Sequence, residues 1–248
     1  MLDLSGRAYV IAEAGTCHAA RDPSHRLSAA LDLVLAASNA GADAVKFQIF
    51  TPAIRDDMFC WIDGDERRAP RWLDSALSLE EWAGVKARAD DLGIDFLASV
   101  FQHRTVGWLK NIRVKATKVA SRAARNFPYE DATGDILVSN GMWEGPIKAP
   151  PGRKVYRLQC ESKYPSHFPW QALRPGFSAH SPTPDLAIDA IKRGCKLVEC
   201  HFYIDPSQAG PDLPASLDLA GLAAVCAARD ACDASPRSNA HQNKGIAA

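Results

Sequence analysis

Short apolar runs recur along the chain, and each ends close to polar residues. Eight of them have the composition of buried strands and lie at 8–13, 43–48, 94–99, 115–119, 135–139, 154–160, 174–178 and 196–200. Amphipathic stretches typical of helices alternate with several of these runs, most clearly at 23–40, 78–91, 182–194 and 216–230. Continuous apolar strands that alternate with helices predict a parallel sheet covered by helices. Eight such strands in this length favour an α/β fold of the closed (β/α)₈ TIM barrel type over an open sheet.

Local start signals support two of the predicted helices. Ser78 followed by Glu81 is a capping-box pattern. Ser181 followed by Pro182 predicts the start of the helix over 182–194. The segment GMWEGPIKAPPGR after the fifth strand is too short and too rich in proline and glycine for a regular helix, and the crossover after the fourth strand is compressed. We therefore predict a barrel with reduced helices around strands four to six.

The length and charge of the chain narrow the class of protein. A single barrel domain over 1–232 accounts for most of the 248 residues, and the small polar residues of 233–248 predict a flexible tail. Lys+Arg and Asp+Glu number 29 each, so no net field indicates binding to nucleic acid or to an anionic membrane. The N-terminus does not resemble a signal peptide, and no apolar run reaches the roughly 18 residues of a membrane span. Seven cysteines without CxxC spacing are typical of a reduced, cytoplasmic protein.

Polar side chains gather at the ends of the predicted strands, where the active site of such a barrel lies. These ends carry Glu13, Lys46, Gln48, Ser99, Lys118, Ser121, Ser139, Asn140, Ser162, Tyr164, Ser178, His180 and His201. Polar groups that recur where apolar strands finish indicate one rim that faces one pocket.

Two lysines of this rim stand in apolar surroundings. Lys46 and Lys118 must each extend outwards to water or face an anion, and an outward lysine beneath a helix is the alternative for either residue alone. Together with Ser99, Ser121 and Ser178 they favour an anion site. Point charges with hydroxyl donors suit a phosphate group.

Two histidines follow neighbouring strands of the barrel. His180 comes after the seventh predicted strand and His201 after the eighth. Two protein ligands are too few for a structural zinc site, but they leave positions open for water and substrate, as a catalytic ion requires. For either histidine alone, a hydrogen-bonded core residue is the alternative. Glu13, at the end of the first strand, either pairs with a lysine such as Lys46 or acts as an acid/base, and both roles stay open.

An ordered set of short stretches resembles the sialic acid synthase (N-acetylneuraminate synthase) family. The stretches are IAEAGTCH at 11–18, AGADAVKFQIF at 40–50, GIDFLASVF at 93–101, TKVAS at 117–121, SNGM at 139–142, CESKYP at 160–165, GFSAHS at 176–181, ECHF at 199–202 and GPDLPASL at 210–217. They run in family order up to about residue 220. The resemblance covers the barrel domain only, since nothing beyond it resembles the family's C-terminal antifreeze-like domain.

The resemblance implies a transferase that condenses phosphoenolpyruvate with a sugar-like aldehyde, as nonulosonic acid synthases do, and releases phosphate. The residues implied to hold phosphoenolpyruvate are Lys46, Ser99, Lys118, Ser121, Ser162 and Ser178. His180 and His201 are implied to bind a divalent metal, with Mn²⁺ favoured and Zn²⁺, Co²⁺ or Mg²⁺ as alternatives. Glu13 is the implied acid/base, acting with Lys46 and Lys118 as the catalytic set. The sugar side is implied to comprise Gln48, Phe101, Tyr164 and Asp212.

Departures from the family pattern leave the acceptor unidentified. The family has an acid where Ala179 precedes the metal histidine, and a glycine where Arg122 follows Ser121. Arg122 or Arg125 is therefore predicted to contact an anionic group on a different acceptor. The basic run at Arg67–Arg68 is interpreted as a solvated loop, although the long segment around it, with Trp61 and Trp72, is a candidate lid.

Two other functions stay open at this point. One is a metal-dependent barrel aldolase or lyase that acts on another phosphorylated substrate. The other is a non-catalytic relative that binds a metabolite. The thinned helical shell and the family resemblance make a homodimer a reasonable expectation.

Overall fold

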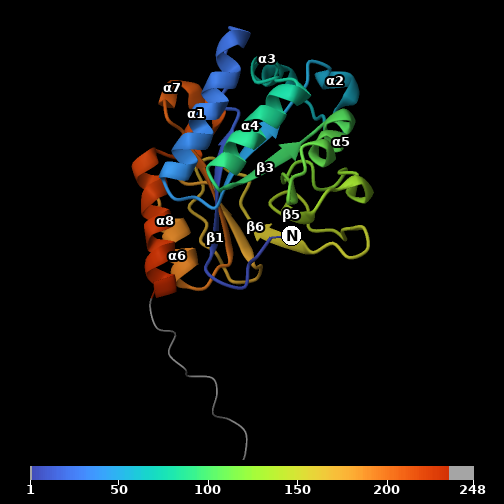
Figure 1. The fold of residues 1–248 in the computed structure, drawn as a ribbon. Helices are drawn as coiled ribbons and strands as arrows, with labels where there is room; N and C mark the ends of the chain where they lie inside the picture. The colour runs from blue at the N-terminus through green and yellow to red at the C-terminus, as the bar shows by residue number, and fades with distance from the viewer. Residues whose placement is uncertain (1, 235–248) are drawn as a thin grey trace, which may run out of the picture.

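The predicted strands form one closed parallel barrel in the computed structural model, which describes residues 2–234 (Figure 1). The strands are β1 (Tyr9–Gly15), β2 (Ala44–Ile49), β3 (Asp95–Val100), β4 (Ala116–Val119), β5 (Asp135–Ser139), β6 (Val155–Gln159), β7 (Gly176–Ala179) and β8 (Leu197–Phe202). Each pairs in parallel with the next, and β1 pairs with β8, which closes the barrel. A ninth short strand, β9 (Ser216–Leu217), extends the sheet beyond β8. The predicted TIM-barrel fold is confirmed.

Helices cover the barrel unevenly. They are η1 (Pro23–His25), α1 (Arg26–Asn39), α2 (Ile54–Asp57), η2 (Asp65–Arg67), α3 (Ala69–Asp74), α4 (Leu79–Asp91), α5 (His103–Asn111), η3 (Tyr129–Asp131), α6 (Asp185–Lys192), α7 (Pro206–Ala209), η4 (Gly210–Ala215) and α8 (Leu219–Ala234). In Figure 1, α1, α4, α6 and α8 cover one side, while the opposite side is formed mainly by loops. Among the described residues from β4 to β7, η3 is the only helical turn, so the predicted loss of helices is confirmed.

Helix boundaries differ from the prediction where local bonds compete with the helix. The capping box of α4 is present, since the Glu81 amide donates to Ser78 Oγ (3.1 Å) and the Ser78 amide donates to a Glu81 carboxylate oxygen (2.7 Å). The hydroxyl of Ser181 accepts instead from the Thr183 amide, and α6 begins only at Asp185. Helix α8 begins at Leu219 because the preceding residues pair with β8 as β9.

Two further differences from the prediction concern helix α5 and the C-terminal tail. Helix α5 is missing from the clearest predicted helices, because it is short and buries few residues. The predicted tail begins inside α8, which continues to Ala234, and the rest of it lies outside the described residues.

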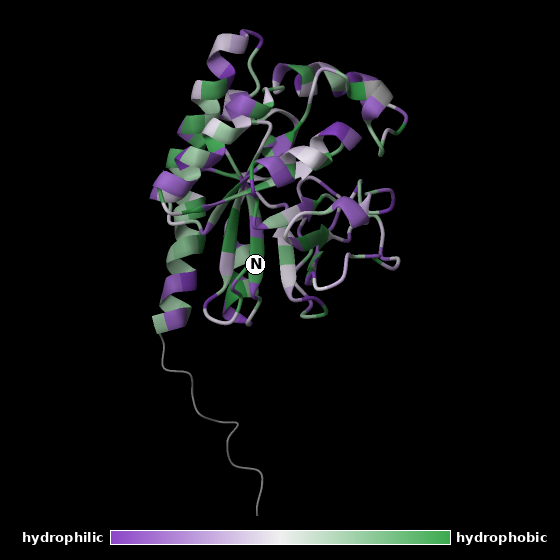
Figure 2. Cartoon of the chain, turned by 45° about the vertical axis from the view of Figure 1, so that its right-hand side comes forward, coloured by the Kyte–Doolittle hydropathy of each residue, from purple (hydrophilic) through white to green (hydrophobic). Residues whose placement is uncertain are grey.

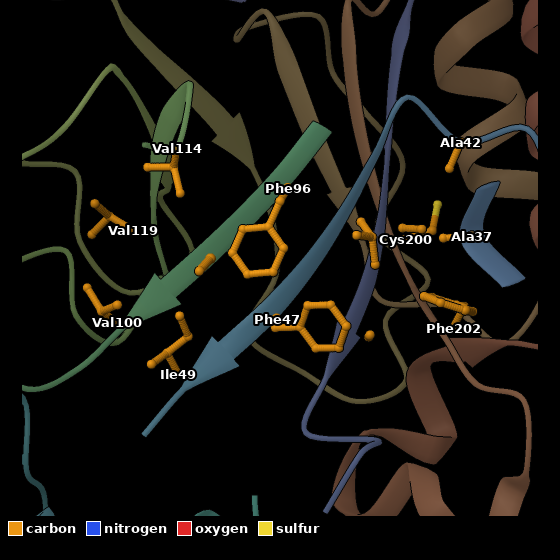
Figure 3. Packing of buried hydrophobic residues seen from close by; sticks show 14 of the residues in the cluster. Ala37, Ala42, Phe47, Ile49, Phe96, Val100, Val114, Val119, Cys200 and Phe202 are labelled. Atoms are coloured by element: carbon orange, nitrogen blue, oxygen red, sulfur yellow. The ribbon is translucent and has the colours of Figure 1, made fainter. Parts of the chain in front are cut away.

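A large apolar layer separates the barrel from its helices. Phe47 on β2 and Phe96 on β3 stack with ring centroids 5.9 Å apart, and Figure 3 shows them side by side on the outer face of the strands. The fully buried Trp82 of α4 packs on both rings. In Figure 2 the strands are largely green and purple gathers in the loops and on outer helical turns, as expected when an amphipathic helix buries one face.

Inside the barrel, an apolar layer at the bottom is followed directly by a polar layer, two residues further along each strand. The apolar layer is a buried cluster that includes Ile11, Ala44, Leu97, Ala116, Leu137, Leu158 and Leu197. Since alternate residues of a strand face the same side, the next inward positions are Glu13, Lys46, Ser99, Lys118, Ser139, Cys160 and Glu199. The polar layer therefore lies towards the carboxyl ends of the strands, which is the end where barrel active sites form.

All seven cysteines lie within the described residues and are free thiols. No disulfide joins the seven cysteines, and all except the exposed Cys232 are buried. Among the described residues, no helix has the length and apolar character needed to cross a bilayer.

Candidate active site

A cavity of about 610 Å³ opens above the polar layer of the barrel. It is lined by all thirteen residues assigned a site role from the sequence: Glu13, Lys46, Gln48, Ser99, Phe101, Lys118, Ser121, Ser162, Tyr164, Ser178, His180, His201 and Asp212. These residues come from seven of the eight strands or the segments that follow them, since none belongs to β5, and the barrel brings them together. Their convergence is a matter of position, and their chemical roles remain predictions.

Two buried lysines at the base of the cavity are held by two buried carboxylates. Lys46 Nζ lies 2.6 Å from Glu13 Oε2 and 3.7 Å from Glu199 Oε2. Lys118 Nζ lies 3.5 Å from Glu199 Oε1 and donates a hydrogen bond of 2.7 Å to Ser139 Oγ. Both lysines thus point into the cavity rather than outwards beneath a helix.

The charges in this cluster control each other's protonation. Burial tends to lower the pKa of Lys46, but Glu13 and Glu199 outweigh it, and the pKa is raised. Burial lowers the pKa of Lys118, with Lys46 adding to the effect and Glu199 opposing it. Burial tends to raise the pKa of Glu199, but the two lysines outweigh it and lower the value. Glu199 is therefore an anion shared by two lysines at neutral pH.

The sequence prediction missed Glu199 as a member of the site. It lies in β8 two residues before His201, so both side chains face the barrel interior. That spacing was the available signal, since an acid at an inward position of a closed barrel needs a cationic partner. Its hydrogen bond from Ser178 Oγ (2.9 Å) further ties it to the predicted site.

A small polar recess beside Lys118 depends on a glycine. The hydroxyls of Ser121 and Ser162 lie 3.3 Å apart. A Cβ at Gly141 would lie 2.6 Å from Ser162 Oγ, 2.7 Å from Cys160 Sγ and 3.0 Å from Ser121 Oγ, so only glycine leaves this space free. Hydroxyl donors next to an ammonium group suit a phosphate-sized anion.

The two histidines predicted to bind metal face the same cavity. Their ring centroids are 5.5 Å apart, and the ring of Tyr164 stacks on His180 at 4.5 Å. His180 Nδ1 lies 2.7 Å from the carbonyl oxygen of Glu161, which only accepts, so Nδ1 carries the hydrogen. Burial and then the neighbouring His201 lower the pKa of His180 to about 4. His180 is therefore a neutral imidazole at pH 7, and its Nε2, which carries the lone pair, lies 3.3 Å from Ser178 Oγ.

These two imidazoles fit a divalent cation that keeps open coordination positions. The Nδ1–carbonyl bond of His180 is the outer-shell contact that commonly orients a metal-binding histidine. His201 Nδ1 lies 4.0 Å from Asp212 Oδ2, which brings a carboxylate to the same place. The described residues contain no group of three or more His, Cys, Asp or Glu side chains arranged to hold a metal. An ion between the two histidines would therefore draw further ligands from water or substrate.

Two of the four residues predicted for the sugar side, Gln48 and Asp212, lie near the end of β1. Gln48 Nε2 lies 3.4 Å from Glu13 Oε1. A Cβ at Gly15, where φ is +55°, would touch both Gln48 Nε2 and Asp212 Oδ2 at 3.4 Å. Gln48 and Asp212 therefore both approach Gly15 and place polar groups in the cavity wall there.

The long segment between β2 and β3 forms part of the cavity wall. A lid over the cavity, as predicted for this segment, would have to lie at this position. Trp72 of α3 is buried against Phe50, with ring centroids 5.0 Å apart, and Phe50 stacks in turn on Phe101. Figure 1 places α2 and α3 at the upper end of the barrel, to which α7 also belongs. Trp61 packs edge-on against Trp72.

The predictions for the arginines need correction. Arg67 and Arg68 are exposed, which agrees with the solvated segment predicted there, and both also line the cavity mouth. Arg122 lines the cavity too, but its guanidinium forms a close ion pair with the buried Asp65 and lies over the Trp72 ring, so its charge is already neutralised. Arg125 is exposed and does not line the cavity.

Comparison with known proteins identifies the family. The NeuB family model matches residues 33–238. An N,N'-diacetyllegionaminic acid synthase of Legionella pneumophila is 27% identical over 85% of this chain and 68% of its own length, and the N-acetylneuraminate-9-phosphate synthase of Homo sapiens is 26% identical over 87% and 67%. Among solved structures, an N-acetylneuraminic acid synthetase from Leptospira borgpetersenii has a TM-score of 0.69 at 21% identity, covering 94% of this chain and 88% of that one, which supports the fold alone. Since the family model matches most of the sequence, the chain belongs to the NeuB family.

Proposed function

We propose that this chain is a transferase that condenses phosphoenolpyruvate with a sugar-like aldehyde and releases phosphate. The observation that carries the proposal is a single cavity in which a phosphate-sized recess, two inward lysines and two histidines lie together. Relatives named as legionaminic acid, N-acetylneuraminate-9-phosphate and pseudaminic acid synthases support it.

The recess beside Lys118 is the proposed place of the phosphate group. Ser121 and Ser162 donate hydrogen bonds to its oxygens, and the Lys118 ammonium supplies charge. The carboxylate of phosphoenolpyruvate then lies towards Lys46 and Ser99, whose Nζ and Oγ atoms are 3.3 Å apart. Lys46 and Lys118 are already paired with Glu13 and Glu199. When the substrate anion binds, each lysine turns part of its hydrogen bonding from these carboxylates to the anion.

His180 and His201 are the proposed holders of a divalent ion, with Mn²⁺ favoured and Zn²⁺, Co²⁺ or Mg²⁺ as alternatives. Bound there, the ion supplies Lewis-acid polarisation of the aldehyde oxygen of the acceptor. The chain's own contribution is to keep His180 neutral and oriented through the Glu161 carbonyl. Asp212 and Gln48, on the same side of the cavity, orient the hydroxyl groups of the acceptor.

The reaction follows from these placements. C3 of phosphoenolpyruvate forms a bond with the aldehyde carbon, and positive charge develops at C2. Water adds to C2 and gives its proton to Glu13, whose carboxylate faces the cavity beside Lys46. The adduct then breaks its C2–O bond to phosphate while the C2 hydroxyl gives its remaining proton to the departing phosphate, which leaves a keto group at C2. The proton held by Glu13 goes to the alkoxide that the aldehyde oxygen became when the C–C bond formed, and the product hydroxyl results. Lys118 with Ser121 stabilises the charge of the departing phosphate.

A direct assay tests this proposal. The metal-loaded chain is incubated with phosphoenolpyruvate and aldoses or amino sugars, and loss of phosphoenolpyruvate, release of phosphate and the new keto acid are measured together. We expect phosphate release to require both the aldehyde and the metal, and Lys118→Ala to abolish it. Phosphate release without a condensation product would favour the lyase alternative, and binding without any turnover would favour the non-catalytic relative. The homodimer and the cytoplasmic location stay expectations.

A further inference from the structure

Three arginines gather at the mouth of the cavity. Arg67 ends η2, Arg68 follows it and Arg71 lies in α3, and all three line the cavity. Among the side chains that the structure describes, no carboxylate oxygen lies within 4.0 Å of these three guanidinium groups. Arg122 on the same wall differs, because Asp65 neutralises it. None of the three arginines is therefore in an ion pair with a described carboxylate, and Asp212 is the acid that lines the same side of the cavity.

Arg71 is held in place by neutral groups only. Its Nε donates to Thr16 Oγ1 (2.8 Å), and its Nη2 donates to the carbonyl oxygens of Thr16 (2.9 Å) and Gln208. A Cβ at Gly210, where φ is +61°, would lie 2.5 Å from Cζ of Arg71, so the backbone there accommodates the guanidinium closely. These contacts fix the side chain between two loops without an ion pair to a described carboxylate, and they leave its Nη1 without a hydrogen-bond partner among the described residues.

The position of Arg71 places this charge on the acceptor side of the cavity. Thr16 directly follows Gly15, over which Gln48 and Asp212 meet. The phosphate recess formed by Ser121, Gly141 and Ser162 belongs instead to the segments after β4, β5 and β6. An anion bound by the arginines is therefore part of the acceptor rather than the phosphate of phosphoenolpyruvate.

The charge balance of the cavity supports the same assignment. At the base, Lys46 and Lys118 stand against Glu13 and Glu199, so that half is balanced before substrate enters. The whole chain has a net charge of zero, so no overall positive charge of the protein accounts for binding of an anion at this cavity. Guanidinium groups bind phosphate and carboxylate through paired, charge-assisted hydrogen bonds.

We propose that the acceptor aldehyde carries an anionic group, a phosphate or a carboxylate, at the end remote from its carbonyl carbon, and that Arg67, Arg68 and Arg71 bind this group. The inference rests on the proposed synthase function and names the class of its second substrate.

Binding of unreactive acceptor analogues tests the inference without turnover. The probes are N-acetylmannosaminitol, its 6-phosphate, and the 6-carboxylate analogue, each titrated calorimetrically into the metal-loaded, phosphoenolpyruvate-bound chain. We expect at least one anionic probe to bind about tenfold more tightly than the neutral probe, as charge-assisted hydrogen bonds to a partly exposed group imply. The better of the two anionic probes distinguishes a phosphate from a carboxylate.

Three variants and a matched control assign the effect to the arginines. The double variant Arg67→Gln/Arg68→Gln removes exposed side chains and breaks no hydrogen bond or ion pair given above, so it should keep the fold and lose the preference for the anionic probe. Arg71→Gln should also lose the preference for the anionic probe. Arg71→Lys should recover part of that preference, because lysine restores the positive charge but not the paired N–H donors of the guanidinium group. Arg125→Gln, an exposed arginine outside the cavity, should bind all probes as the unsubstituted chain does.

The outcomes separate this inference from the synthase function. Equal binding of neutral and anionic probes, or a preference that survives in all three variants, overturns the anionic acceptor. Variants that weaken phosphoenolpyruvate binding as much as probe binding also overturn it, because the arginines would then serve only to attract that substrate. If the matching neutral aldehyde is consumed as efficiently as the anionic ones, the synthase function stands and the inference falls. If the anionic probes bind through the arginines but no aldehyde consumes phosphoenolpyruvate, the anion site stands and the synthase function falls.

Discussion

Lys46 Nζ lies 2.6 Å from Glu13 Oε2, with both side chains almost completely removed from solvent. Removing one member of such a pair leaves a buried charge without its partner, which typically costs about 3–5 kcal/mol. We expect Lys46→Met to destabilise the fold by about 3 kcal/mol, since water entering the cavity reduces the cost. Chemical denaturation with urea measures the change.

The double variant separates pairing from packing. Glu13→Gln combined with Lys46→Met should recover most of the lost stability, because the unpartnered carboxylate is gone. Additive losses in the double variant would mean that the two side chains contribute independently. Glu13→Gln alone should lower kcat by about 100-fold or more if Glu13 accepts the proton from water.

Gly141→Ala should block the proposed phosphate recess. The added methyl group would meet Ser162 Oγ at 2.6 Å and Cys160 Sγ at 2.7 Å, so either the hydroxyl turns away or the loop shifts. We expect the KM for phosphoenolpyruvate to rise at least about tenfold, as loss of a hydrogen bond to a charged group implies. Steady-state kinetics at saturating acceptor measures it.

A matched glycine provides the control for that experiment. A Cβ at Gly84 in α4 would meet nothing within 4 Å. Gly84→Ala should therefore leave the KM unchanged and stabilise the helix by about 0.5–1 kcal/mol. An unchanged KM in Gly141→Ala would place the phosphate elsewhere in the cavity.

Strand periodicity accounts for what could be predicted from the sequence. Lys46, Lys118 and Ser99 end apolar runs, and a closed barrel turns their side chains to one interior. The same alternation would have found Glu199, two residues before His201. The fold and the base of the cavity therefore follow from local patterns combined with barrel closure.

The structure of the cavity mouth depends on long-range contacts that cannot be predicted from the repeating pattern of apolar residues. Arg71 reaches Thr16 and Gln208, which are 55 and 137 residues away in the sequence. Arg122 was predicted to face the substrate, but it pairs with Asp65 in a segment without a repeating pattern. Irregular loops pack through single long-range contacts, so the sequence cannot tell which arginine is neutralised and which is free.

Arg122 and Asp65 should hold the segment between β2 and β3 against the barrel. Arg122 also donates to the carbonyl oxygen of Cys60 (3.3 Å), so it joins two points of this segment to the loop after β4. Arg122→Met leaves the buried Asp65 without a cation, and we expect faster proteolysis between α2 and α3. Limited trypsin digestion followed by mass spectrometry measures it. Arg125→Met removes a neighbouring exposed arginine and should leave the cleavage rate unchanged; equal protection of both variants would mean that other contacts hold the segment.

His18 should make the stability of the fold depend on pH. It is completely buried, its Nε2 lies 2.8 Å from the carbonyl oxygen of Ser75, and its ring packs edge-on against Phe47 and Trp82. Burial lowers its pKa from 6.5 to about 4. The unfolded chain therefore takes up a proton at a higher pH than the folded chain does. The stabilising contribution is complete above about pH 6.5 and is lost as the pH falls towards 4, by roughly 3 kcal/mol in total.

Urea unfolding of the unsubstituted chain and of His18→Gln, measured between pH 7 and pH 4.5, checks this expectation. The difference in stability between the two should shrink as the pH falls, because the glutamine has no proton to gain. Other titrating groups contribute equally to both chains and cancel in the difference. His25→Gln removes an exposed histidine in the nearby η1 and serves as the matched surface control. A constant difference for His18→Gln across this range would mean that His18 is protonated as readily in the folded protein as in the unfolded chain.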